Sequence, residues 1–190
     1  MLKLNDEDFL LISSDIHDDE QIFEKLAQLA SSPKCIAFLY AGDLNIENYF
    51  ISSALQCRSF VFIPVAGNCD NPWSANDINL QLPLYRNCTF KNLKIFITHG
   101  HRYYDPNSVG LNNTDFDIII TGHSHKHSLT EQIEENKKLI YLNPGSPSKP
   151  RGDCIASYAL IRFSQNSTIV ETRRLDSDEL LSQITIPAHK

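Results

Sequence analysis

The stretch DFLLISSDIHD, residues 8–18, joins a continuous apolar run to a short acidic segment that contains a histidine. A short apolar run bounded by polar residues is typical of a buried strand. CIAFLYAGD at 35–43 and SFVFIPVAGNCD at 59–70 repeat this arrangement, and helical patterns at 18–33 and 46–58 separate the three runs. This strand–helix–strand–helix–strand order predicts parallel strands joined by right-handed crossovers.

The second half of the chain has the pattern of hairpins. LYRNCTFKNLKIFITHG at 84–100 predicts two strands joined near Lys91–Asn92, and residues 127–146 predict another pair with a polar turn at Glu135–Lys137. Residues 115–125 contain one more buried strand, and 157–163 with 168–175 predict an antiparallel pair. The polar stretch from Asp176 has no assignment. We expect one mixed α/β domain over residues 1–190, with 170–190 as a candidate peripheral tail.

Composition narrows the classes of function. The 190 residues carry a formal net charge of −6, which argues against non-specific binding to nucleic acid or to a membrane surface. No apolar run approaches the roughly 20 residues that span a bilayer, and the acidic start differs from the basic start of a signal peptide. Five scattered cysteines without a C-x-x-C pair predict reduced thiols and a cytoplasmic protein.

Polar groups follow the apolar runs at their carboxyl ends. The first three runs end in DIH, GD and GNCD, and the later ones end in HGH and GHSH. In open α/β sheets the loops at these ends converge on one crevice. Taken singly, such residues fit structural roles, for example a turn cap for Asp15 or a left-handed backbone position for Asn68. Their ordered recurrence favours a metal site instead.

The ordered set DIH, GD, GNCD, HG and GHSH resembles the calcineurin-like metallophosphoesterases. The chain length and the NPGS…PR loop at 143–151 look closest to the small phosphodiesterase subgroup of that family. The resemblance implies a sandwich of two mixed β-sheets flanked by helices. It also implies a set of ligands for two divalent ions: Asp15, His17 and His125 for the first ion, Asn68, His99 and His123 for the second, and Asp43 as a bridge between them.

By the same resemblance, the protein would hydrolyse a small-molecule phosphate ester, most simply a phosphodiester, by attack of a metal-bridging hydroxide. Imidazole, carboxylate and amide ligands favour Mn, with Ni, Co, Zn or Fe as alternatives. A phosphomonoesterase with the same site is the alternative among enzymes. A non-catalytic protein-binding scaffold of this fold, as in a retromer subunit, is the alternative from another class. A homo-oligomer is compatible with the sequence.

Position 69 departs from the pattern of the wider family. Many members read G-N-H-[DE] where this chain reads GNCD, so Cys69 replaces a histidine that assists the leaving oxygen, although the small phosphodiesterases often share this cysteine. A thiol titrates near ~8.5 and is a poor substitute for an imidazolium. We therefore expect His101 to contact phosphate or the leaving group. Asn68 and Cys69 would also bind substrate, and Asn68 would be catalytic; a buried filler is the structural alternative for Cys69.

Overall fold

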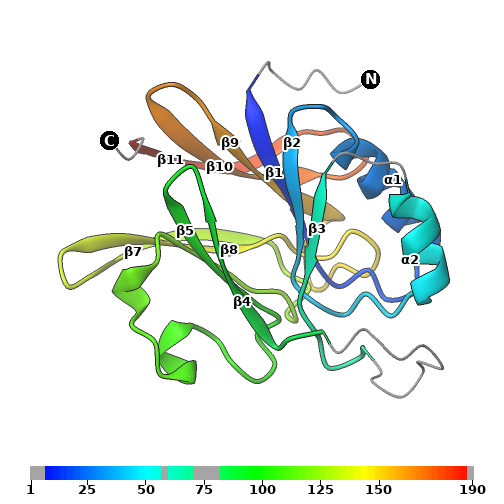
Figure 1. Ribbon diagram of the computed structural model, residues 1–190, viewed down its shortest axis with the longest axis horizontal. Helices are drawn as coiled ribbons and strands as arrows, with labels where there is room; N and C mark the ends of the chain where they lie inside the picture. Colours follow the sequence, from blue (N-terminus) through cyan, green and yellow to red (C-terminus); the bar gives the residue numbers. More distant parts are fainter. Residues whose placement is uncertain (1–6, 57–59, 71–81, 188–190) are drawn as a thin grey trace.

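The computed structural model describes residues 7–56, 60–70 and 82–187. Two mixed β-sheets lie face to face, and helices α1 and α2 lie beside the larger sheet (Figure 1). The larger sheet has the strand order β11-β10-β9-β1-β2-β3, and the smaller one has the order β4-β5-β6-β8-β7. The predicted α/β sandwich of two mixed sheets with flanking helices is therefore confirmed.

The N-terminal half forms the predicted crossover unit. It contains β1 (Asp8–Ser13), α1 (Glu20–Ala30), β2 (Cys35–Tyr40), α2 (Asn48–Leu55) and β3 (Val61–Pro64), with β1–β2 and β2–β3 parallel. Helix α1 begins at a cap in which the Asp19 side chain accepts a hydrogen bond from the backbone N–H of Ile22, at 3.0 Å. Because all three strands run the same way, their carboxyl ends meet at one edge of the sheet.

The smaller sheet combines two hairpins and a central strand. Its strands are β4 (Tyr85–Phe90), β5 (Leu93–Thr98), β6 (Ile118–Ile120), β7 (Ser128–Glu134) and β8 (Lys137–Asn143), and the short helices η1 (Pro106–Val109) and η2 (Asn113–Asp115) precede β6. The two predicted turns are confirmed, since Lys91–Asn92 and Glu135–Asn136 have positive φ at both positions, as type I′ hairpins require. Strand β6 pairs in parallel with β5 and with β8.

The C-terminal part adds three strands to the larger sheet: β9 (Ser157–Phe163), β10 (Ser167–Arg174) and β11 (Leu180–Pro187). The antiparallel pairing of β9 with β10 was predicted. Strand β11 was not, and it pairs with β10 over residues that the sequence suggested as a peripheral tail. This segment belongs to the sheet because Ile184 and Ile186 pack against the core between the sheets. The polar residues before them obscured this alternation of apolar and polar side chains in the sequence.

Apolar side chains cover both faces of the central strands β1 and β2 of the larger sheet. Leu10, Ile12 and their neighbours on β2 and β9 pack against Ile95, Ile97 and the apolar residues of β6 and β8 between the sheets. Phe9 and Leu11 point the opposite way, toward Phe23 and the rest of the buried face of α1. Burial on both faces explains the continuous apolar runs. Within the described ranges, no helix is long and apolar enough to cross a membrane.

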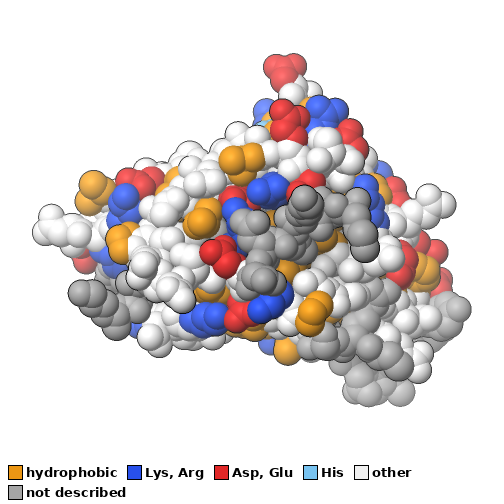
Figure 2. All heavy atoms as spheres, turned by 90° about the horizontal axis from the view of Figure 1, so that it is seen from above, with side chains coloured by type: hydrophobic (Ala, Val, Ile, Leu, Met, Phe, Trp, Pro, Cys, Tyr) orange, Lys and Arg blue, Asp and Glu red, His pale blue; other side chains and the backbone are white. Residues whose placement is uncertain are grey.

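A charged network occupies the outer face of β9 and β10. The fully buried Glu171 carboxylate accepts hydrogen bonds from the guanidinium groups of Arg162 and of Arg173, the latter at 2.8 Å. Arg173 also lies 3.1 Å from Asp178, which accepts a hydrogen bond from the Tyr158 hydroxyl. On the surface seen in Figure 2, by contrast, acidic and basic side chains are interspersed.

Replacing Glu171 with alanine should lower the free energy of unfolding by about 2–3 kcal/mol, because two largely buried guanidinium groups lose their shared counter-charge. Urea unfolding measures the change. Glu131→Ala is the matched control, since it removes an exposed ion pair with Lys138 and should cost less than about 1 kcal/mol. Equal effects of the two substitutions would show that the buried network adds no particular stability.

Candidate metal centre

The predicted ligands all lie in loops that follow strands. Asp15 and His17 follow β1, Asp43 follows β2 and Asn68 follows β3, all in the larger sheet. In the smaller sheet, one loop follows β5 and another follows β6, and these two loops carry the remaining three residues, His99, His123 and His125. The candidate centre therefore lies where the loops of the two sheets meet, and residues separated by more than 100 positions come together there.

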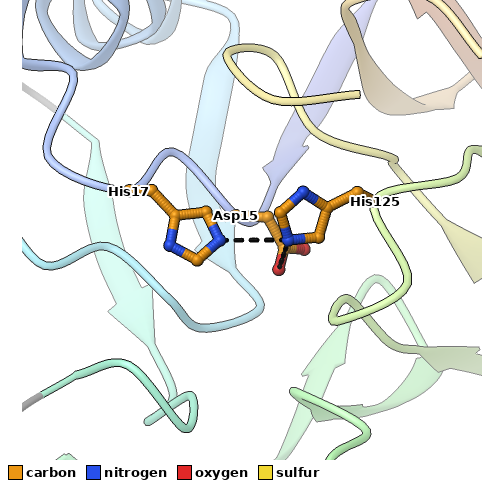
Figure 3. Close-up of side chains that lie close together, drawn as sticks. All are labelled: Asp15, His17 and His125. Atoms are coloured by element: carbon orange, nitrogen blue, oxygen red, sulfur yellow. Dashed lines mark hydrogen bonds and ion pairs between the residues drawn. The ribbon is translucent and has the colours of Figure 1, made fainter. Parts of the chain in front are cut away.

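The first cluster consists of Asp15, His17 and His125, whose side chains point toward one another in Figure 3. The Nε2 atoms of His17 and His125 are 3.0 Å apart, and His125 Nε2 is 3.3 Å from Asp15 Oδ1. Asp15 is fully buried, and its Oδ2 accepts a hydrogen bond from the backbone N–H of His123 at 2.9 Å. Its Oδ1 has no hydrogen-bond partner. A buried, unpartnered carboxylate oxygen beside two imidazole nitrogens suits a bound cation.

The second cluster is centred on Asp43. Its Oδ2 atom lies 3.6 Å from Nε2 of His17 and 3.3 Å from Nε2 of His99. Its other oxygen, Oδ1, accepts a hydrogen bond from the backbone N–H of Cys69 at 2.7 Å, which fixes the carboxylate. The amide oxygen of Asn68 lies 3.1 Å from Nε2 of His99. One carboxylate oxygen thus faces imidazoles from both clusters.

The remaining predicted residues lie at the rim. The His123 side chain is exposed, and its ring centroid is 5.2 Å from that of His99. The His101 ring is also 5.2 Å from His99, and its buried Nδ1 has no partner. Cys69 is exposed and accepts a hydrogen bond from the Asn68 amide, with Nδ2 and Sγ 3.2 Å apart. All nine predicted site residues therefore converge on one region.

Two histidines are oriented by backbone carbonyls. His99 Nδ1 is 2.7 Å from the oxygen of Ala41, and His125 Nδ1 is 2.6 Å from the oxygen of Lys149. Because a carbonyl oxygen only accepts hydrogen bonds, each Nδ1 must carry the proton and donate it. The Nε2 lone pairs of both rings are thereby directed into the centre, which is the orientation that metal-ligating histidines need.

The local electrostatics suit cation binding in part. Burial raises the pKa of Asp15 and lowers the pKa values of His17 and His125, so both imidazoles favour their neutral form. Burial opposes the lowered pKa of Asp43, but the neighbouring His99 and the hydrogen bond from the Cys69 N–H outweigh it. Burial likewise lowers the pKa of His99, but the Asp43 and Asp15 carboxylates outweigh this and raise it. Metal ions bind ionised carboxylate and neutral imidazole, so the pKa shifts of Asp43, His17 and His125 favour the metal-binding forms, whereas those of Asp15 and His99 oppose them.

A family model described as the calcineurin-like phosphoesterase superfamily domain matches residues 9–166. The chain belongs to this superfamily. Phosphodiesterase YfcE of Escherichia coli K12 is 25% identical, with 93% of this chain and 97% of that protein covered. The solved structure of YfcE has a TM-score of 0.72 at 23% identity, covering 93% of this chain and 98% of that one. The expected relation to the small phosphodiesterase subgroup is confirmed.

Solved structures of Vps29 have the same fold. Vps29 of Cryptosporidium parvum has a TM-score of 0.67 at 21% identity, covering 97% of this chain and 99% of that one. Wild-type Vps29 of Entamoeba histolytica, solved in complex with Zn²⁺, has a TM-score of 0.62 at 21% identity, with coverages of 95% and 99%. At these identities the likeness shows the fold alone.

Several loops of this superfamily member hold the predicted ligands in strained backbone conformations. The φ angles of Asp15, His17, Asp43, His123 and His125 are all positive, between 48° and 65°. For residues other than glycine each such conformation costs of order 1–3 kcal/mol. Strain of this kind persists where the surrounding structure imposes it, and it clusters at functional sites.

Glycines allow the loops to pack together. A Cβ atom on Gly67 would lie 2.0 Å from Asp43 Oδ1, and one on Gly42 would lie 2.6 Å from His99 Nδ1. A Cβ on Gly122 would lie 2.8 Å from Asp15 Oδ2. Each glycine precedes a predicted ligand in its own loop and touches a ligand from another loop, so any side chain there would separate the ligands.

Asp70 supports the centre in a way that the sequence did not reveal. Its carboxylate accepts hydrogen bonds from the backbone N–H groups of Asp43, Asn45 and Gly67, at 2.8, 2.9 and 2.7 Å. It therefore ties the loop after β2 to the loop after β3. The only available signal was its place in GNCD, where an acidic residue next to predicted ligands indicates function without specifying it.

The loop after β8 supports the first cluster from the other side. Ser146 donates a hydrogen bond to the backbone oxygen of Asp15 at 2.7 Å, and Ser148 donates one to that of Ile16 at 2.6 Å. Asn143 donates to the oxygen of Gly122 at 2.8 Å. These bonds hold the loops after β1 and β6 beside each other.

Asp70→Asn should reduce the affinity for Mn²⁺ by roughly 10-fold or more, since residues that orient ligands commonly affect metal affinity this strongly. The physical reason is that an amide NH₂ would face backbone N–H donors. Titration calorimetry measures the affinity. Asp105→Asn is the control, because Asp105 caps η1 through the N–H of Ser108. An unaltered Mn²⁺ affinity in Asp70→Asn would refute this positioning role.

Proposed function

We propose that the protein is a dinuclear metal-dependent phosphodiesterase acting on a small phosphate ester. Membership of the calcineurin-like phosphoesterase superfamily supports hydrolysis of a phosphate ester. The observation that carries the dinuclear assignment is the position of Asp43, whose Oδ2 atom faces the inward nitrogens of both His17 and His99. A single carboxylate between two sets of imidazoles is what two adjacent cations need to offset their repulsion.

Each set of side chains would hold one ion. Asp15, His17 and His125 would bind the first ion, Asn68, His99 and His123 would bind the second, and Asp43 would be shared. Divalent ions there would supply Lewis-acid activation of water and positive charge for phosphoryl oxygens. The oxygen and nitrogen ligands favour Mn²⁺, with Ni²⁺, Co²⁺, Zn²⁺ or Fe²⁺ as alternatives.

The chain's own residues would bind and orient the ester. Asn68 offers an amide beside His99, and the His101 ring lies 5.2 Å from the same ring. Burial and the neighbouring His99 lower the pKa of His101, and burial and the Asp43 carboxylate raise the pKa of the Cys69 thiol. Both groups are therefore uncharged at neutral pH. Neither group would offer a positive charge to phosphate, which suits a monoanionic diester better than a dianionic monoester and makes the phosphomonoesterase the second choice among enzymes.

A scaffold without catalytic activity is the alternative from another class, because Vps29 proteins share the fold. The unpartnered Asp15 oxygen supports a bound cation, which the enzyme requires and a scaffold does not, since an empty site would leave a buried acceptor unsatisfied. We also propose that the protein is cytoplasmic. The described cysteines, Cys35, Cys69, Cys88 and Cys154, are all free, which suits a reducing compartment.

Asp43→Asn should lower the bound metal from about two ions per chain to about one or fewer, and should reduce diester hydrolysis by at least ~100-fold, because the shared negative charge is lost. Elemental analysis after Mn²⁺ loading and a chromogenic diester and monoester assay measure the two quantities. Asp176→Asn, at an exposed site paired with Arg174, is the control. Full occupancy with full turnover in Asp43→Asn would exclude the bridge. Wild-type protein that binds metal but hydrolyses neither ester would favour the scaffold.

His101→Ala should reduce turnover by roughly 10²-fold while both ions stay bound, because His101 contributes a hydrogen bond to phosphate or the leaving oxygen rather than a metal bond. Metal content and diester kinetics are measured together. His101→Gln should restore part of the turnover, since its amide also donates a hydrogen bond. Loss of metal from His101→Ala, or unchanged turnover, would contradict this role.

A further inference from the structure

Cys69 lies in a second group of atoms that could hold a cation. Its Sγ, a ring nitrogen of His17 and a carboxylate oxygen of Asp43 all lie within 4.8 Å of one another. The Cys69 N–H bond to Asp43 Oδ1 places the cysteine backbone directly against that carboxylate, and the Asn68 amide contacts the sulfur. The thiol is thus held at the centre from two sides.

This group and the first cluster share His17. His17 belongs to both groups, and its Nε2 lies 3.0 Å from Nε2 of His125 and 3.6 Å from Oδ2 of Asp43, so both groups describe the surroundings of one ion rather than two. That ion would already have Asp15, His17, His125 and Asp43 as ligands. The unpartnered Oδ1 of Asp15, which is fully buried and 3.3 Å from His125 Nε2, independently marks this position as a cation site. Cys69 Sγ would occupy a further coordination position on the same ion.

We propose that Cys69 is a conditional metal ligand, which binds thiophilic dications such as Zn²⁺ and Co²⁺ at the ion held by His17 and does not bind Mn²⁺. The inference rests on the proposed metal centre. In the step itself the S–H bond breaks, a sulfur–metal bond forms and the proton passes to solvent. No oxidation or reduction occurs.

The selectivity follows from ligand softness. Thiolate sulfur binds Zn²⁺ and Co²⁺ more strongly than it binds Mn²⁺, which prefers oxygen and nitrogen. The other ligands at this ion are all of those harder types. Cys69 is therefore the side chain that would make the centre discriminate between the two kinds of ion. Because catalytic sites keep an open coordination position, a bound thiolate would also close the ion toward substrate.

The experiment is optical spectroscopy of the full chain loaded with Co²⁺. A thiolate ligand gives an intense charge-transfer band in the near ultraviolet, whereas nitrogen and oxygen ligands give only weak ligand-field bands in the visible region. We expect the wild-type protein and the control Cys154→Ser to show both features, since Cys154 belongs to none of the candidate ligand groups among the described residues. Cys69→Ser should keep the ligand-field bands and lose the charge-transfer band.

Competition titrations with Zn²⁺ and Mn²⁺ provide a second readout. Cys69→Ser should lower the Zn²⁺ affinity by at least ~10-fold, because even residues that only orient metal ligands change the affinity by that much. The Mn²⁺ affinity should fall by less than ~3-fold, because Mn²⁺ does not bind the sulfur. Thermal unfolding of the variant verifies that it folds. Ligand-field bands without a charge-transfer band in wild type would refute the thiolate ligand and leave the metal centre standing. Absence of any Co²⁺ binding would refute the centre as well.

Discussion

The candidate centre depends on the burial of one carboxylate, that of Asp15. One of its oxygens is bound by the backbone N–H of His123, which ties the loop after β1 to the loop after β6 across the two sheets. The other oxygen faces His125 with no hydrogen-bond partner. Burial disfavours the ionised form of this carboxyl, as its raised pKa indicates, and a bound cation would offset that cost. Cation binding would therefore be coupled to the close approach of the two sheets.

The loops around this carboxylate are held in place by more than one set of hydrogen bonds. Positive φ angles at the predicted ligand positions are unfavourable by themselves. They are offset by hydrogen bonds that the Asp70 carboxylate accepts on one side and that Ser146 and Ser148 donate on the other. The strands β1, β2 and β6 beneath these loops limit relaxation, since they are buried on both faces. Strain and support together preorganise the ligand atoms, which reduces what an ion must reorder when it binds.

Much of the fold could be predicted from the sequence, because apolar runs and turn residues report local structure directly. The hairpin turns at Lys91–Asn92 and Glu135–Asn136 are examples. Strand β11 was missed because its packing depends on a partner strand, β10, that composition does not reveal. The convergence of the polar strand ends followed from the parallel topology. The role of Asp70 could not be predicted from the sequence, because a carboxylate that accepts hydrogen bonds from backbone N–H groups cannot be told from a further metal ligand by its sequence position.

The packing of Gly42, Gly67 and Gly122 against ligands from neighbouring loops has a consequence for how such a centre could be lost or kept in descent. Two of the steric demands would remain in a lineage that no longer bound ions, because a Cβ on Gly67 would also lie 2.3 Å from the backbone nitrogen of Asp43 and one on Gly122 would lie 2.8 Å from the backbone oxygen of Ala41. Gly42 has in addition a φ of +87°, which residues with a side chain rarely adopt. A descendant that lost its ligands would therefore still be expected to keep these glycines, because the packing of the loops requires them.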